Sequence, residues 1–184
     1  HDPDAPPGSE KTHLCLGPGW SNCSNSPFRR HKIWVHEGGV ATPMVASWPN
    51  GIKARGELRH DMGHVIDFLP TIMDLAGMKP EDLPLPQDAP SLPGKSLVPT
   101  FEQDGSVEHA HIYFHHEGNR ALRVGNWKLV NESLVNRGTT DDPWALYDLS
   151  KDRCEMVDLS TDMPQKYQEM RDQWQRCEYR TKCV

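Results

Sequence analysis

The residues best suited to chemistry lie in a basic segment that covers residues 26–49. Arg29, Arg30 and Lys32 stand close together, and Glu37 follows five residues after Lys32, directly before two glycines. Lysine can hold an anion as a point charge and arginine as a planar fork, while glycine lets the backbone approach a ligand or another strand closely. An anion site and a solvated basic loop before a strand both fit this pattern, and spacing alone favours the loop.

A second group of candidate residues contains His109, His111, His115, His116 and Glu117. In a strand, His109, His111 and His115 would lie on one face, and three histidines could ligate zinc or copper. The alternative is a polar strand face that carries ordinary histidines. The sequence favours this second interpretation, and we predict no metal ligand in the chain.

Composition excludes several classes of function. The chain has 184 residues and a formal net charge of −6, which gives no support to a nucleic-acid partner, because phosphate binding needs a basic face. No apolar run is long enough to span a membrane. The first residues are polar and rich in proline, and they do not begin with methionine. We therefore expect a processed or truncated N-terminus.

The cysteines leave two alternatives open. No C-x-x-C pair occurs among them, which argues against a structural zinc site. Cys15 and Cys23, like Cys177 and Cys183, are close enough in sequence to form disulfides in an oxidising compartment. Free thiols in a half-buried setting are an equal alternative.

The first part of the chain offers few regular elements to position the basic segment. Residues 1–31 read as irregular, and residues 40–48 as a short, largely buried strand that contains Pro43. Apolar residues at helical spacing predict a helix over 65–76, with Gly77 as its stop. Six prolines in 79–99 predict an extended connector.

The second part predicts a small antiparallel sheet with a helix across it. Residues 111–124 and 127–131 flank Gly125-Asn126, a two-residue hairpin signal. Residues 144–149 give a further strand. The last element is a helix over 163–177 with one apolar stripe. We therefore divide the chain into 1–78, the connector 79–99, and a C-terminal α+β subdomain at 100–184.

The string P-F-R-x-x-K-x-x-x-x-E-G-G, followed by T-P and W-P-x-G, resembles the formylglycine-dependent sulfatase family, arylsulfatases included. Three further stretches agree in order: HVIDFLPTIMDLAG, LPGKSL, and HHEGNRALRVGNWKLV with LYDLSKDRCEMVDL. The resemblance implies an α/β fold of the alkaline-phosphatase-like type. The chain would hold the end of the large mixed-sheet catalytic domain and the small C-terminal subdomain.

The resemblance also implies roles for particular residues. Lys32 corresponds to the family's lysine that contacts the sulfate group, and it is our candidate catalytic residue. Glu37 and the glycines would shape the loop. His116, Asn119 and Arg120 are candidates for contacting the rest of the substrate, although Arg120 could equally pair with a carboxylate in the fold.

The family's nucleophile is a formylglycine made in a C-x-P-x-R motif, which this sequence does not contain. Its divalent cation, usually calcium, is held by carboxylate and amide oxygens that we expect upstream of this chain. The implied activity of the parent protein is sulfate-ester hydrolysis on a sulfated small molecule or glycan, in the periplasm or outside the cell. The fragment alone would be inactive.

Two rival functions fit the same motifs. One is another enzyme on this scaffold, a phosphodiesterase or phosphomutase. The other is a degenerate binding module without catalysis. A nucleophile motif upstream would decide between them.

Overall fold

The computed structural model describes residues 4–6, 9–12, 15–86, 88–133 and 143–182. The chain divides into two compact units. The sheet unit comprises His1–Pro43 and Tyr113–Val184, and the α3 unit comprises Met44–Ile112. The predicted boundaries at 78 and 99 concern where the parent's catalytic domain ends, and they stay a prediction.

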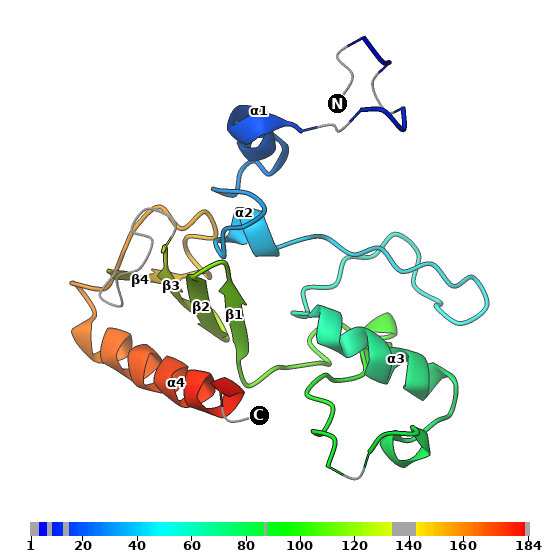
Figure 1. Ribbon diagram of the computed structural model, residues 1–184. Helices are drawn as coiled ribbons and strands as arrows, with labels where there is room; N and C mark the ends of the chain where they lie inside the picture. The colour runs from blue at the N-terminus through cyan, green and yellow to red at the C-terminus, as the bar shows by residue number, and fades with distance from the viewer. Residues whose placement is uncertain (1–3, 7–8, 13–14, 87, 134–142, 183–184) are drawn as a thin grey trace. The chain divides into compact units, whose positions relative to one another are not determined.

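The sheet unit is built on four strands in the order β1-β2-β3-β4 (Figure 1). β2 and β3 form the predicted hairpin, closed by Gly125-Asn126, and Gly125 has the positive φ of 56° that such a turn requires. β3 pairs antiparallel with β4. The strands are β1 (Ile112–His116), β2 (Asn119–Val124), β3 (Trp127–Asn131) and β4 (Trp144–Asp148).

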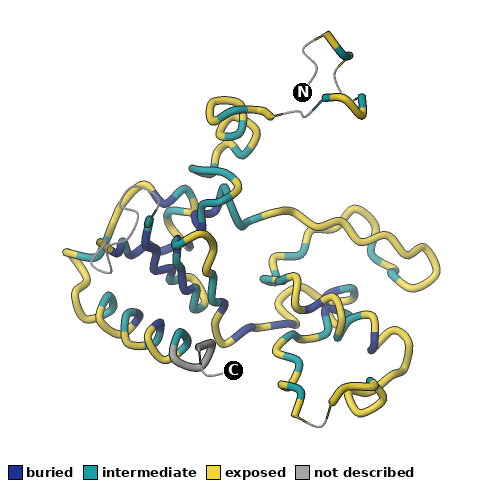
Figure 2. The backbone as a smooth tube through the Cα atoms, in the orientation of Figure 1, coloured by how far each residue is buried: buried dark blue, intermediate teal, exposed yellow. Residues whose placement is uncertain are grey.

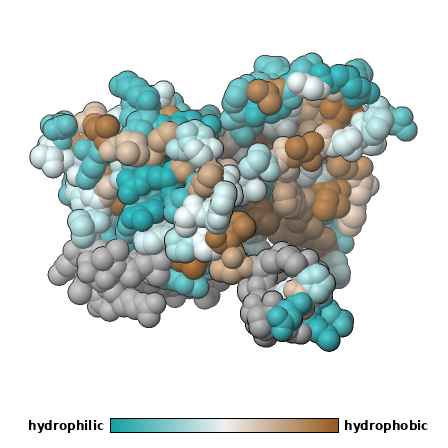
Figure 3. Space-filling model, turned by 90° about the horizontal axis from the view of Figure 1, so that it is seen from above, coloured by the Kyte–Doolittle hydropathy of each residue, from teal (hydrophilic) through white to brown (hydrophobic). Residues whose placement is uncertain are grey.

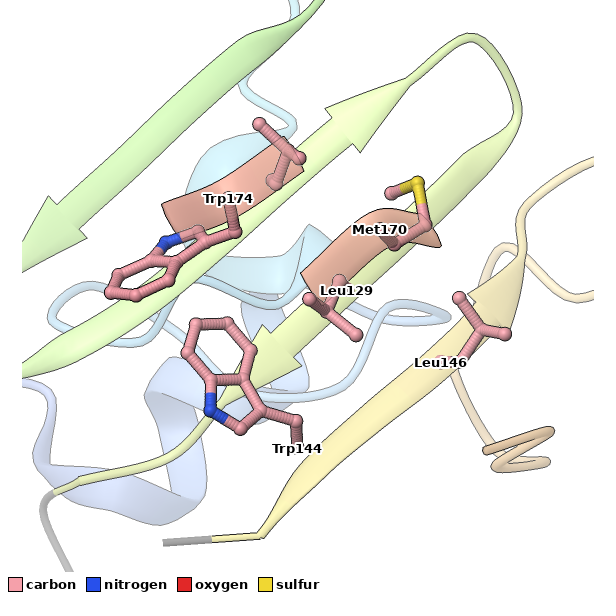
Figure 4. Close-up of a cluster of buried hydrophobic side chains, with 6 residues drawn as sticks. Leu129, Trp144, Leu146, Met170 and Trp174 are labelled. Atoms are coloured by element: carbon pink, nitrogen blue, oxygen red, sulfur yellow. The ribbon is translucent and has the colours of Figure 1, made fainter. Parts of the chain in front are cut away.

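Helix α4 (Pro164–Lys182) lies along one face of this sheet, as its apolar stripe predicts. Met170 and Trp174 from the helix pack against Leu129, Trp144 and Leu146 (Figure 4), and the rings of Trp144 and Trp174 lie 4.7 Å apart. This cluster is the main hydrophobic core. The predicted C-terminal sheet with a helix across it is therefore confirmed.

The opposite face of the sheet is covered by residues that precede the short helix α2 (Glu37–Val40). Val35 packs there against Ala121, Val130, Tyr147 and Leu149. Because side chains alternate along a strand, neighbouring residues of β2 and β3 point to opposite faces. This alternation decides which of the candidate residues can meet.

Two predictions for the first part of the chain were wrong. Gly17–Ser24 forms helix α1 inside the segment expected to be irregular. The expected buried strand at 40–48 is instead an irregular segment, in which Val45 is 91% exposed. A strand needs a neighbour to share its hydrogen bonds, and none of the described strands pairs with this segment.

The α3 unit contains the predicted helix, formed by the turn η1 (Val65–Asp67) and α3 (Phe68–Leu75), with Gly77 in the left-handed conformation beyond it. Two short 3₁₀ turns follow, η2 (Pro80–Asp82) and η3 (Val98–Phe101). Met73 is the buried residue of α3, and most of the helix is exposed (Figure 2).

Exposed apolar side chains of the α3 unit include Val65, Phe68, Leu69 and Ile72. Apolar side chains appear in brown on the molecular surface in Figure 3. Among the described helices, none is both long and apolar enough to cross a lipid bilayer.

Candidate functional site

Lys32 lies at the tip of a tight loop formed by residues 29–34, which we call the Lys32 loop. The side chain of Lys32 is exposed, and the loop closes through a hydrogen bond from Trp34 N to His31 O of 3.0 Å. Arg30 and Ile33 have positive φ values of 69° and 91°. Such values are uncommon for residues with a side chain, so the surrounding structure must hold this loop in shape.

The two glycines after Glu37 let this loop fold back onto helix α2. Gly38 N donates to Arg29 O at 3.1 Å. A Cβ atom on Gly38 would lie 2.3 Å from that same oxygen, and a Cβ on Gly39 would lie 2.0 Å from Trp34 O. Neither position can accept a side chain unless the backbone moves. The glycines therefore shape the loop, as the resemblance implied.

Glu37 anchors the loop through a cluster of charged side chains inside the sheet unit. Lys128 Nζ donates to Glu37 Oε1 at 2.8 Å and lies 2.9 Å from Glu155 Oε1. Glu155 Oε2 accepts from the backbone N–H of Glu37 at 2.6 Å. Arg153 reaches Glu37 Oε2 at 3.1 Å. We call Glu37, Lys128, Arg153 and Glu155 the buried ion cluster, because its lysine and two glutamates are at most 2% exposed.

The two glutamates of this cluster differ in their electrostatics. Burial alone would raise the pKa of Glu37, but Lys128 and Arg153 outweigh it and hold that pKa below its usual value. Burial raises the pKa of Glu155, and Lys128 opposes this shift without cancelling it. The difference follows from the second cation, since only Glu37 is bonded to Arg153 as well.

The other two cations of the loop are bound within the fold. Arg29 donates to the backbone oxygen of Glu155 at 2.8 Å. Arg30 donates hydrogen bonds to both carboxylate oxygens of Glu132, at 2.8 and 3.3 Å. Lys32 thus differs from both arginines: no acidic partner for it occurs among the described residues.

A buried histidine lies beneath the same loop. His36 Nε2 lies 3.3 Å from Glu132 Oε1. Burial, with Arg29, Lys128 and Arg30 nearby, lowers the pKa of His36 to about 3. The ring is therefore neutral at physiological pH, and its charging at lower pH opposes folding.

Asn119 is completely buried and contacts the Lys32 loop directly. Its side-chain Nδ2 donates to Ile33 O at 3.3 Å, and its Oδ1 accepts from Ser133 N at 3.2 Å. It begins β2 on the same face of the sheet as Lys128 of β3. In this structure its amide holds the backbone beside Lys32.

The other predicted substrate contacts lie elsewhere. Arg120 follows Asn119 directly, so it points to the opposite face of the sheet, where its guanidinium lies 5.6 Å from the ring centre of Trp174. His116 is exposed at the end of β1. The structure brings Asn119 to the Lys32 loop and separates Arg120 from it.

The histidine group does not converge on a common point. His109 Nε2 lies 2.9 Å from Asp67 Oδ2 inside the α3 unit, while His111 and His115 are exposed. No three potential metal ligands gather anywhere in the described part of the chain. Cys15 and Cys23 are free thiols, and Cys183 lies outside the described residues.

Sequence reasoning missed Lys128, Arg153 and Glu155. They lie 91 or more residues from Glu37, and no local pattern connects them. One signal was present: Lys128 interrupts the apolar run of β3 at a position where alternation points inward. A charged residue there indicates a buried partner.

Comparisons with known proteins identify the family of the chain. Residues 29–180 match the family model described as "N-sulphoglucosamine sulphohydrolase, C-terminal". An uncharacterized sulfatase of Schizosaccharomyces pombe is 29% identical over 91% of this chain and 30% of its own length. Human arylsulfatase A is 32% identical over 72% of this chain and 28% of its own length.

A solved structure, titled as a complex with its substrate D-glucosamine-2-N,6-O-disulfate, matches 63% of this chain and 24% of its own chain with a TM-score of 0.43 and 24% identity. The chain thus spans less than a third of the length of the relatives described here. On the family match, this chain belongs to the sulfatases and corresponds to their C-terminal portion.

Proposed function

We propose that the whole protein containing this chain hydrolyses sulfate esters and that Lys32 contacts the sulfate group. The observation that carries this proposal is the combination of an exposed lysine with a rigid loop. The cation has no acidic partner among the described residues, and the backbone on both sides of it is hydrogen-bonded: Arg29 O accepts from Gly38 N, and Ile33 O accepts from Asn119. Membership of the sulfatase family supports the same assignment.

The chemistry of the reaction explains why such a lysine is useful. Cleavage of the S–O bond builds negative charge on the oxygens of the sulfate and of the leaving alcohol. A cation that is already in place when this charge develops stabilises the transition state without further reorganisation. The Lys32 loop meets this requirement because its φ values, glycines and buried anchors specify one backbone path.

Sulfatases generally use a formylglycine and a divalent metal, which supply the nucleophile and polarise the sulfate. We propose calcium as the metal, since carboxylate and amide oxygens suit it. We assign its ligands to a part of the protein outside this chain, as the family resemblance implies. This chain contributes the lysine and the scaffold that orients it.

We further propose that the substrate is a sulfated small molecule or glycan. The names of two relatives, arylsulfatase A and N-acetylgalactosamine-6-sulfatase of the rat, support a substrate of this class. His116 and Arg120 stay proposals for contacts with the part of the substrate that carries no sulfate. For Asn119 we favour a role through the Lys32 loop, because its side chain is buried.

The test is the kinetics of the whole protein on an aryl sulfate. We expect Lys32→Ala to lower kcat/KM by about two orders of magnitude or more, because a charge-stabilising donor is lost. Lys166→Ala is the control for loss of a lysine charge, since this lysine pairs with Glu169 on α4, across the sheet from the loop. Unchanged kinetics for Lys32→Ala would refute the assignment.

The same assay separates the rival functions. Turnover of an aryl phosphate ester in place of the sulfate would indicate a phosphodiesterase or phosphomutase. Binding of sulfated ligands without any turnover would indicate a binding module. For the isolated 184-residue chain we expect no turnover.

A further inference from the structure

We propose that Lys128, Glu155 and Asn119 are positioning residues for catalysis, which hold Lys32 where the sulfate binds. The proposal rests on the function proposed above for Lys32. The C-terminal sheet would then contribute to the reaction. Its strands and the turn after β4 would set the position of the Lys32 ammonium group, on a loop that is distant in sequence.

Two of these residues, Glu155 and Asn119, contact the Lys32 loop and its flank at three separate points. At its start, Arg29 donates to the backbone oxygen of Glu155, 126 residues away. Near its end, the Ile33 carbonyl accepts from Asn119, 86 residues away. Just beyond its end, the Glu37 N–H donates to the Glu155 side chain, 118 residues away.

Lys128 holds the last of these anchors together. Its ammonium group bridges the carboxylates of Glu37 and Glu155 at 2.8 and 2.9 Å. Without the lysine, two buried carboxylates would face each other and repel. Glu155 contacts both sides of the loop, because its backbone oxygen accepts from Arg29 and its carboxylate accepts from the Glu37 N–H. A shift of the Glu155 backbone would therefore act on both sides.

Stability alone is a weak reason for such a cluster. Moving charges out of water is costly, and well-packed apolar residues often replace a buried ion pair at no loss or with a gain. What charged groups add is direction, because each hydrogen bond fixes an atom at a definite place. Displacement of a catalytic group by about 1 Å can cost about 100-fold in rate, which is the scale on which this anchoring matters.

The test is a double-mutant cycle in the whole protein. Lys128→Met should lower kcat/KM for an aryl sulfate by about 10- to 100-fold and weaken the binding of inorganic sulfate, measured by calorimetry. In the Lys32→Ala background the same substitution should change either quantity by less than about three-fold. A residue that acts only through Lys32 has nothing left to position once Lys32 is gone.

A second variant guards against failure to fold. Glu155→Gln keeps the shape of the side chain and an acceptor for the Glu37 N–H but removes the charge that Lys128 meets. It should lower kcat/KM when Lys32 is present and change it little in the Lys32→Ala background. Asn119→Ala, which removes the donor to Ile33, should give the same pattern. Lys166→Met, on the other face of the sheet, should change neither quantity.

The possible outcomes separate the two proposals. Fold-changes that multiply in the double variants would overturn the positioning role and leave Lys32 as the sulfate contact. Wild-type behaviour of Lys32→Ala, with Lys128→Met impaired, would overturn both the assignment of Lys32 and the action of Lys128 through it.

Discussion

Two buried carboxylates, one in each unit, both connect segments that are distant in sequence, but they use different kinds of partner. Glu37 in the sheet unit and Asp67 in the α3 unit are at most 2% exposed, and each ties its own segment to a distant one. Glu37 meets the charged side chains of Lys128 and Arg153. Asp67 instead accepts from backbone N–H groups and lies beside a histidine.

The partners of Asp67 come from three places. The N–H of His64 donates to Asp67 at 2.7 Å, that of Lys95 at 2.8 Å, and His109 Nε2 lies 2.9 Å away. These bonds fix the chain around residue 95 to the start of α3. No lysine or arginine among the described residues pairs with Asp67, so loss of one donor leaves the others in place.

The difference predicts how much stability each region should lose when one partner of its carboxylate is removed. In the buried ion cluster, removal of one partner leaves an uncompensated charge in the interior, which costs much more than a lost hydrogen bond. Around Asp67 the anion shares several donors, and each is worth the smaller amount of a single charged hydrogen bond. The Lys32 loop should therefore be the more sensitive of the two regions.

The largest effect is expected for Lys128→Met. It leaves Glu37 and Glu155 buried without the cation between them, so the free energy of unfolding should fall by about 3–5 kcal/mol. Urea unfolding of the whole protein, followed by tryptophan fluorescence, measures this change. A loss below about 1 kcal/mol would mean that the cluster is not the sensitive anchor that the comparison requires.

Replacing the whole cluster sharpens the same comparison. A triple variant, Glu37→Met with Lys128→Leu and Glu155→Met, should recover much of the stability lost in Lys128→Met, because no buried charge is stranded. The turnover of an aryl sulfate should stay low, because the hydrogen bonds of the buried ion cluster that position the Lys32 loop are gone. Recovery of both the free energy of unfolding and the turnover would contradict the claim that the cluster positions the loop as well as stabilising the fold.

Gly39→Ala should have the next largest effect. Its Cβ would meet Trp34 O at 2.0 Å, so the Lys32 loop must shift, with a loss of about 2 kcal/mol or more in the free energy of unfolding. Gly19→Ala is the matched control, because nothing lies within 4 Å of its Cβ and it stands in helix α1. There alanine should be neutral or slightly stabilising. Equal losses at the two positions would argue against the tight loop.

Low pH should destabilise the sheet unit through protonation of His36. Its folded pKa of about 3 lies below its ordinary value of 6.5, so the unfolded chain takes up the proton first. Stability is therefore full above pH 6.5 and falls as the pH drops, by roughly 2 kcal/mol on going to about pH 5. His36→Gln should remove most of this fall in urea unfolding at the two pH values. A slope unchanged by the substitution would show that other groups cause it.

Asp67→Asn should have the smallest effect of the series. The amide keeps one oxygen acceptor and loses the negative charge, so we expect a loss of about 1–2 kcal/mol, measured in the same way. The activity of the whole protein should change far less than in Lys128→Met. A loss of activity as large as in Lys128→Met would erase the distinction between the two carboxylates.

Local patterns predicted the elements that depend on local physics. The spacing of Tyr167, Met170 and Trp174 predicted α4, and Gly125-Asn126 predicted the hairpin, because helical period and turn chemistry are written in neighbouring residues. The same reasoning failed at residues 40–48, where an apolar run has no strand to pair with among the described residues. It also missed the short helix α1.

The candidate site was predictable only in part. A motif singled out Lys32 and Glu37, and the role of Lys32 stays a prediction. The close approach of the backbone at Gly38 and Gly39 agrees with the loop-shaping role expected of the glycines. The partners of Glu37 could not be found, because Lys128 and Glu155 meet it only after the sheet has formed. The direction of Arg120 could have been inferred from strand alternation, since its neighbour Asn119 must face the other way.

The most direct test of the account is a crystal structure of the whole protein with inorganic sulfate bound. We predict that Lys32 Nζ lies within about 2.7–3.2 Å of a sulfate oxygen, with the buried ion cluster intact beneath it. A sulfate bound beside the nucleophile of the whole protein, with Lys32 turned away into solvent, would contradict the central claim.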